Sequence, residues 1–228
     1  MTDRKQLPFV TKAAKATPPI SDLYSYFENS SRVVSELPYA HIEELATCLE
    51  KACEEGRTVF LFGNGGSAAL ASHFACDLGK GTATWGRVHK RFRVVSLAEN
   101  MALLTAWAND TSYEQVFAEQ LRNLVQPGDI AFAISGSGSS PNVLRALQLA
   151  RESGAVNIGL TGFKGGKMKE LCDLCVVVPS DNMQIIEDMH LSIAHALSTV
   201  IRNRMMYAFD SMAADGTSSA GTREVSVI

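Results

Sequence analysis

Two residues that could take part in chemistry follow a glycine-rich turn early in the chain. His73 and Asp77 are four positions apart, so on a helix they project from the same face. A histidine and a carboxylate at this spacing can bind a metal ion or act as an acid–base pair. The same spacing also suits a simple ion pair on the helix surface, and the pattern by itself leaves these possibilities open.

A second group of such residues lies in a long helix expected over residues 183–207. It contains Glu187, Asp188, His190 and His195. At 100° per residue, Glu187 and His195 share one broad side of the helix, while Asp188 is aligned more closely with His195. Spacing therefore favours Asp188 as the partner of His195. His190 is the weaker candidate, expected to pack or to orient its neighbours, and His195 could itself be a core histidine.

Two loops have the composition of anion-binding sites, and each connects an expected strand to the helix that follows it. An apolar run over residues 59–62 leads into Gly63-Asn64-Gly65-Gly66-Ser67, and a second run over 130–134 leads into Ser135-Gly136-Ser137-Gly138-Ser139-Ser140. A glycine turn between strand and helix presents backbone N–H groups at the positive end of the helix dipole, and serine hydroxyls add further donors. Both loops are therefore expected to bind a phosphate or similar anion. The alternatives are an ordinary turn capped by Ser67 and a flexible linker.

The elements that position these residues alternate between strands and helices. Gly154 is expected to stop one helix and Pro141 to start it. Alternation of this kind predicts an α/β fold with a doubly wound, five-stranded parallel sheet, preceded by two helices, whose ligands bind beyond the carboxyl ends of the strands. The expected strands are 58–62, 93–97, 129–134, 156–161 and 175–178; the expected helices are 20–36, 42–52, 67–79, 99–107, 113–125, 141–153, a short one ending at Leu171, and 183–207.

Composition narrows the class of protein. The chain has 228 residues, 46% of them hydrophobic, and a formal net charge of −3, so neither nucleic-acid binding nor a membrane span is expected. Its five cysteines have no framework spacing, which indicates reduced thiols and a cytoplasmic protein. Cys172 and Cys175 have C-x-x-C spacing, but a redox or zinc role receives little weight without a partner pair. Residues 1–19 are expected to be a flexible leader, 20–208 one domain, and 209–228 a disordered tail.

In combination, these motifs resemble a known family. The Gly63–Ser67 and Ser135–Ser140 loops, with His73-Phe74-Ala75, Ala108-Asn109-Asp110, Leu160-Thr161-Gly162 and the helix of Glu187, His190 and His195, are similar to the SIS (sugar isomerase) domain. The similarity is greatest to the sedoheptulose 7-phosphate isomerases, also called phosphoheptose isomerases, and runs from about Ser21 to Arg204. It implies a flavodoxin-like SIS domain and a homotetramer with active sites at subunit interfaces.

The resemblance also implies roles for individual residues. Asp77 and His195 would be the catalytic pair, and a divalent ion, expected to be zinc, would be held by His73, Asp77, Glu187 and His195. The family carries Glu at position 77 and Gln at position 187, so the shorter Asp77 and the charged Glu187 are departures from it. A seven-carbon sugar phosphate would be bound by Asn64, Gly65, Gly66, Ser67, Asp77, Asn109, Asp110, Ser135, Gly136, Ser137, Ser140 and Glu187.

Two other functions fit parts of the same pattern. SIS relatives include a non-catalytic adaptor that binds a bacterial replication initiator and has lost catalytic residues. The presence of His73, an acid at position 77 and His195 argues against that function here. A sugar-phosphate-sensing regulator is a third possibility, but the chain shows no DNA-binding segment. An isomerase is therefore the expected activity.

Overall fold

The computed structural model describes residues 20–83 and 90–214, with side chains to residue 211. Its centre is a five-stranded sheet in the order β2-β1-β3-β4-β5, in which every neighbouring pair is parallel. This is the doubly wound arrangement that the sequence predicts. The strands are β1 (Thr58–Gly63), β2 (Arg93–Ser96), β3 (Ile130–Ser135), β4 (Val156–Thr161) and β5 (Leu174–Val177).

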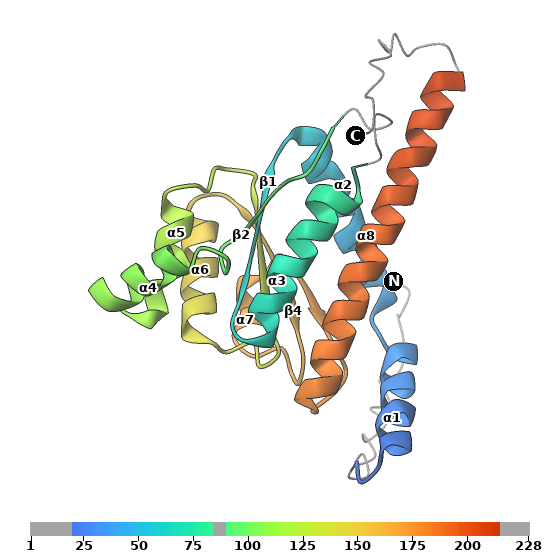
Figure 1. Ribbon diagram of the computed structural model, residues 1–228, viewed down its shortest axis with the longest axis horizontal. Coiled ribbons are helices and arrows are strands. Elements are labelled where there is room, and N and C mark those ends of the chain that lie inside the picture. Colours follow the sequence, from blue (N-terminus) through green and yellow to red (C-terminus); the bar gives the residue numbers. More distant parts are fainter. Residues whose placement is uncertain (1–19, 84–89, 215–228) are drawn as a thin grey trace, which may run out of the picture.

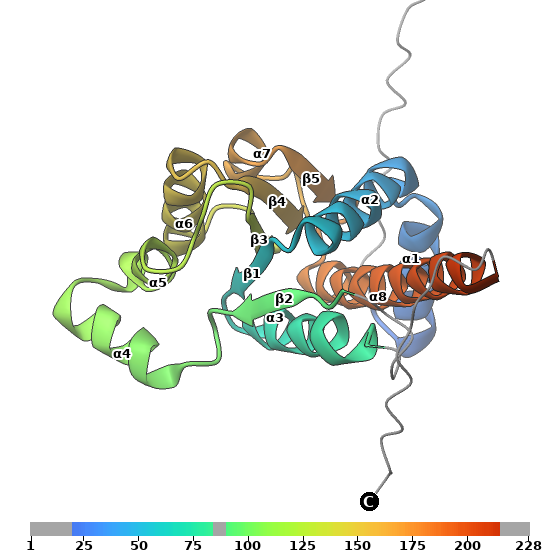
Figure 2. The same cartoon turned by 90° about the horizontal axis from the view of Figure 1, so that it is seen from above.

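Helices cover both faces of this sheet (Figures 1 and 2). Seen from above, the helices that cover one face and those that cover the other appear on opposite sides of the strands (Figure 2). A further helix, α4 (Met101–Asp110), lies apart from the sheet and has no buried residue. On one face lie α1 (Leu23–Ser35), α2 (Tyr39–Glu55), α3 (Gly66–Cys76) and α8 (Met183–Ala214); on the other lie α5 (Ala118–Arg122), α6 (Pro141–Glu152) and α7 (Met168–Leu171).

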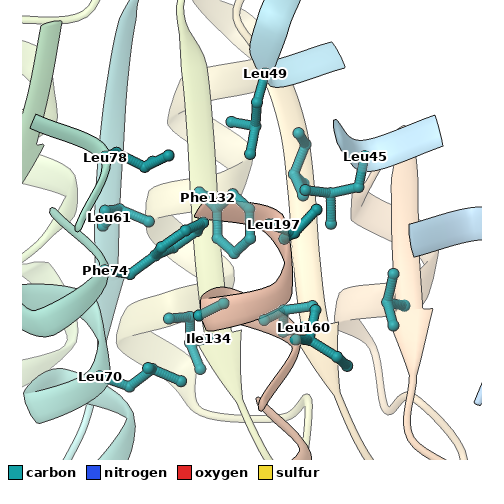
Figure 3. Packing of buried hydrophobic residues seen from close by; sticks show 14 of the residues in the cluster. Leu45, Leu49, Leu61, Leu70, Phe74, Leu78, Phe132, Ile134, Leu160 and Leu197 are labelled. Carbon is teal, nitrogen blue, oxygen red and sulfur yellow. The ribbon is translucent and has the colours of Figure 1, made fainter. Parts of the chain in front are cut away.

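The side chains of each strand point alternately to the two faces of the sheet, and this divides the core into two clusters. In β1, Val59 and Leu61 join the cluster under α2, α3 and α8, whereas Phe60 and Phe62 join the one under α5 and α6. Successive side chains of a strand point to opposite faces, so a strand covered on both sides must be apolar throughout. The uninterrupted apolar runs in the sequence therefore arise from a sheet buried between two helical layers. Figure 3 shows the first cluster, in which Phe74 of α3 packs on Phe132 of β3.

The helix after the glycine turn ends earlier than expected. The sequence predicts a helix over 67–79, but α3 stops at Cys76 and is followed by a π-helical turn, η1 (Asp77–Gly81). Gly79 and Gly81 have low helix propensity, and the amide of Thr82 donates to the carbonyl oxygen of Asp77 in the wider turn. Asp77 therefore lies where the helix changes its winding. Single π-helical turns of this kind are frequent at functional sites.

Other boundaries also differ from the expectation. The stretch 113–125 forms a short 3₁₀ turn, η2 (Tyr113–Gln115), and the five-residue α5 rather than one helix. Helix α8 extends to Ala214, so residues 209–214, expected in the tail, are helical. The predicted leader, 1–19, and the rest of the tail, 215–228, lie outside the described residues. Within the described part of the chain, no helix combines the length and apolarity that a membrane span requires.

Candidate active site

The first loop is a tight strand-to-helix turn built on glycine. A methyl group at Gly63 would lie 2.5 Å from the carbonyl oxygen of Ile134 on the neighbouring strand, so only glycine lets the backbones approach this closely. Gly65 has φ 54° and is the N-cap of α3, with no side-chain cap. Ser67, considered above as a possible cap, instead lies inside the first turn of the helix and is buried. The turn thus places the start of α3 at the carboxyl end of β1, where the first amides of a helix are available to an anion.

The serine loop follows β3 at the same edge of the sheet. The carbonyl oxygen of Gly136 accepts hydrogen bonds from the amide of Gly162 at 2.9 Å and the hydroxyl of Thr161 at 3.3 Å, which ties the loop to the end of β4. The hydroxyls of Ser135 and Ser140 lie 3.4 Å apart, while Ser137 is exposed. Helix α6 then begins at Pro141. The loop is thus an ordered turn and not a linker, with hydroxyls at the start of a helix.

Three of the predicted site residues converge between α3, η1 and α8. His73 and His195 bring their Nε2 atoms to 3.1 Å from each other. The Asp77 Oδ2 atom lies 3.6 Å from Nε2 of His73 and 3.8 Å from Nε2 of His195. The partner carboxylate of His195 is therefore Asp77, from another element, rather than Asp188 of its own helix. Asp77 is half-buried and both histidines are exposed, so a ligand can reach the cluster.

The donor set of this cluster fits a divalent metal ion. The three ligating atoms all lie within 4.8 Å of one another, and the imidazole nitrogens and carboxylate oxygen are donors that zinc accepts. Two imidazole lone pairs at 3.1 Å repel each other unless a proton or a cation lies between them. In the arrangement described, one histidine must donate to the other, and a metal ion could take the place of that proton.

Glu187 lies at a different point along α8. Its carboxylate faces the start of α3, because a methyl group at Gly66 would lie 2.9 Å from both of its oxygens. It does not belong to the set of atoms formed by His73, Asp77 and His195 among the described residues. A carboxylate at a helix N-terminus is favoured by the helix dipole, and it also occupies the space that an anion would use. Glu187 is thus placed beside the glycine turn, eight positions before His195 on α8.

The remaining acidic and histidine candidates on α8 do not belong to the cluster of His73, Asp77 and His195. Asp188 accepts a 2.6 Å hydrogen bond from the hydroxyl of Tyr26 on α1, and this bond raises the pKa of Tyr26 to about 12. His190 is fully buried, and within the described part of the chain neither of its ring nitrogens has a hydrogen bond of ordinary geometry. Burial lowers the pKa of His190 to about 4, an effect that the backbone of Thr161 only partly offsets. His190 is therefore a neutral core residue in this chain.

Asn109 and Asp110 lie away from the cluster. They end helix α4, both are exposed, and the Asn109 amide donates to Asp110 Oδ1 at 2.8 Å. In both views α4 stands on the opposite side of the molecule from α8 (Figures 1 and 2). Within one chain, these two residues are therefore not brought to His73 and His195.

The structure adds residues that the sequence reasoning did not identify. Asn142 and Tyr113 both hydrogen-bond the side chain of Asn64 in the first loop. Asn142 lies two positions after the serine loop, which was a usable signal, whereas nothing in the sequence marks Tyr113. The pocket beside the cluster has a volume of about 220 Å³, and it is lined by Asp77, Gly81, His195, Ser198, Thr199 and Arg202.

Comparison with known proteins agrees with this geometry. The SIS domain family matches residues 24–162. Phosphoheptose isomerase of Aliarcobacter butzleri (strain RM4018) is 36% identical over 82% of this chain and 97% of its own length, and that of Paramagnetospirillum magneticum (strain ATCC 700264 / AMB-1) is 44% identical over 66% and 76%. The structure of phosphoheptose isomerase from Neisseria gonorrhoeae superposes with a TM-score of 0.73, at 30% identity, over 79% of this chain and 96% of that one.

These likenesses cover the parts of the chain that build the site. The matched family region includes both anion loops, His73 and Asp77, and the relative from Aliarcobacter butzleri is matched over almost its whole length. The sheet order and the helical layers are those of a solved relative. This chain therefore belongs to the SIS-domain family and, within it, to the phosphoheptose isomerase family of enzymes.

Proposed function

We propose that this enzyme interconverts sedoheptulose 7-phosphate and D-glycero-D-manno-heptose 7-phosphate, the first step toward a heptose precursor. The observation that carries the proposal is the convergence of His73, Asp77 and His195, of which Asp77 and His195 line an open pocket. An aldose–ketose isomerase needs acid–base groups of this kind beside a site that binds phosphate. The curated relatives named phosphoheptose isomerase support the choice of substrate.

We assign the proton transfer between C1 and C2 to Asp77 and His195. The reaction needs one base, one acid and stabilisation of the enediolate oxygen. Asp77 turns Oδ2 toward the histidines, so its Oδ1 is the atom that can take a proton from carbon. His195 turns Nε2 toward the cluster, so its Nδ1 is the atom that can exchange a proton with the substrate oxygen. Each residue can thus contribute to the cluster and still meet the substrate.

A divalent ion, which we expect to be zinc, would be held by His73, Asp77 and His195, one ion in each subunit. The family resemblance adds Glu187, whose carboxylate would have to leave its place at Gly66 to join them. When bound, the ion would act as a Lewis acid on the substrate carbonyl. The three-residue set leaves open positions for the substrate, as catalytic metal sites do.

Substrate binding is assigned to the two loops. Ser135, Ser137 and Ser140, with the amide of Gly136, would hold the phosphate at the start of α6. Eight residues separate Glu187 from His195 on α8, about 12 Å of helix, so a chain bound by its phosphate at the loops can extend toward the cluster. The sugar would be positioned by Asn64, Gly65, Gly66, Ser67, Asn109, Asp110 and Glu187.

We also propose a homotetramer that works in the cytoplasm. Leu23, Tyr24 and Phe27 of α1 are 67–80% exposed, and α4 has no buried side chain although most of its residues are apolar. Exposed apolar surface on two helices is typical of interfaces between subunits. An assembly would also explain how Asn109 and Asp110 could serve a sugar, by contributing to the site of a neighbouring subunit.

The test measures metal content and turnover in the same preparations. Asp77→Asn and His195→Ala should each lower kcat by roughly 10²–10⁴, the usual contribution of one acid–base group. The double variant should be little worse than either, because residues that act as a unit are not additive. His41, exposed on α2, supplies the matched control, and His41→Ala should retain full kcat and metal. Near-full turnover in both single variants, with metal bound, would contradict the assignment.

A further inference from the structure

Two asparagine side chains join the anion loops to each other. Nδ2 of Asn64, in the glycine turn after β1, donates to Oδ1 of Asn142 at 2.9 Å, and Nδ2 of Asn142 donates back to Oδ1 of Asn64 at 2.8 Å. Asn142 is the second residue of α6, the helix that begins immediately after the serine loop, and is 2% exposed. The two amides therefore form a closed ring of hydrogen bonds that holds one loop at a fixed distance from the other.

The direction of every bond in this ring follows from one backbone amide. The N–H group of Val143 donates to Oδ1 of Asn142 at 3.0 Å, so this atom must be oxygen and the other must be the Asn142 amide nitrogen. The atom of Asn64 that faces this nitrogen is then its oxygen. The same oxygen lies 2.9 Å from the hydroxyl of Tyr113, which must be the donor.

This orientation leaves Asn64 a single polar function for a ligand. Its oxygen has two lone pairs, and the bonds from Asn142 and Tyr113 fill both. One of its two N–H bonds is used by Asn142, so, as far as contacts of the described residues go, the other N–H bond is the side-chain group that remains. Asn64 can thus donate one hydrogen bond to a ligand and can accept none.

We propose that Asn142 and Tyr113 are positioning residues. They orient Asn64 so that its side chain donates a single hydrogen bond to an acceptor oxygen of the bound sugar phosphate. The oxygen belongs either to the phosphoryl group or to the sugar carbonyl, both of which accept hydrogen bonds without needing to donate. The inference rests on the proposed function for the identity of the ligand. The amide ring also links the phosphate loop to the glycine turn, so that the two loops act as one site.

The experiment replaces one NH₂ group of the ring by oxygen. Asn142→Asp has nearly the volume of the native residue, but it sets a carboxylate oxygen against Oδ1 of Asn64, and rotation of Asn64 only exchanges one oxygen–oxygen contact for another. We expect kcat/KM to fall at least tenfold, roughly the value of one well-formed hydrogen bond. Tyr113→Phe should reduce it less, because the ring remains. Asn123→Asp, at the exposed C-cap of α5, is the matched control and should leave kcat/KM unchanged.

A double-mutant cycle separates positioning from a merely structural role. If Asn142 acts through Asn64, Asn142→Asp should change kcat/KM less than twofold in an Asn64→Ala background. Equal losses in both backgrounds, or no loss in the native one, would overturn the proposal. A higher KM at unchanged kcat would assign the acceptor oxygen to the phosphate, and a lower kcat at unchanged KM would assign it to the oxygen that gains charge during the reaction.

Thermal unfolding of the same four proteins tests the amide ring independently of the proposed isomerase activity. Asn142→Asp should lower that temperature in the native background and much less beside Asn64→Ala, because the oxygen–oxygen contact is then absent. Wild-type protein that does not convert sedoheptulose 7-phosphate would refute the proposed function. A thermal cycle without coupling would refute the amide ring, whatever the activity.

Discussion

His190 should make the stability of this enzyme depend on pH. The side chain is fully buried on α8, and no residue that the structure describes gives its ring nitrogens a hydrogen bond of ordinary geometry. Burial lowers its pKa from 6.5 to about 4. The unfolded chain therefore takes up a proton below about pH 6.5, whereas the folded chain resists protonation until about pH 4.

The sign and size of the effect follow from these two values. Above about pH 6.5 the histidine is neutral in both the folded and the unfolded state, and the free energy of unfolding does not change through it. As the pH falls, the unfolded state binds more protons than the folded state, so the free energy of unfolding decreases. The gap between the two pKa values corresponds to about 3 kcal/mol at full effect, and about 2 kcal/mol of it is lost between pH 7 and pH 5.

The assay is urea unfolding at several pH values and one protein concentration, since subunit association would otherwise shift the result. Wild type should lose about 2 kcal/mol more than His190→Leu between pH 7 and pH 5. His190→Met is a second apolar replacement in case the first packs poorly, and His41→Ala is the exposed control, which should follow the wild type. Identical pH profiles for wild type and both apolar variants would refute the reasoning and would place a protonatable, hydrogen-bonded histidine in the core.

Two further predictions concern the phosphate loop and the core. Ser137→Ala and Ser140→Ala should each raise KM roughly tenfold, for about 1.4 kcal/mol of lost hydrogen bonding, and steady-state kinetics that show no change in either variant would move the phosphate elsewhere. Phe74→Ala should lower the free energy of unfolding by about 3–5 kcal/mol, because the ring is fully buried against Phe132 (Figure 3). A loss below about 1 kcal/mol in urea unfolding would mean that the neighbouring side chains refill the space.

The sequence by itself determined the elements and the place of the loops. Apolar runs that alternate with helical segments predicted the five strands, and the runs of β1 and β3 are the most continuous because these strands are buried on both faces. Gly154 and Pro141 marked helix boundaries through their backbone preferences, and the structure confirms both. The pairing of His73 with Asp77 was also a local matter, because neighbours four residues apart on a helix lie on one face.

Only the tertiary structure decided which residues from separate elements meet. Helical spacing along α8 favoured Asp188 as the partner of His195, yet Asp188 is bound by Tyr26 and the carboxylate near His195 is Asp77. Helical periodicity fixes directions within one helix, but it does not fix the axial position of that helix against another. That position depends on how the side chains of α3 and α8 pack on the sheet, a property of the whole core.

The same reason explains the contacts of the first loop. Asn64 and Asn142 are 78 positions apart, and neither residue type nor spacing indicates that their amides form a ring. The parallel register of β1 and β3 aligns the ends of the two strands, which brings the residues just beyond them together. The sequence therefore specified the chemical groups and their local geometry, while the sheet and its helical layers brought those groups into one site.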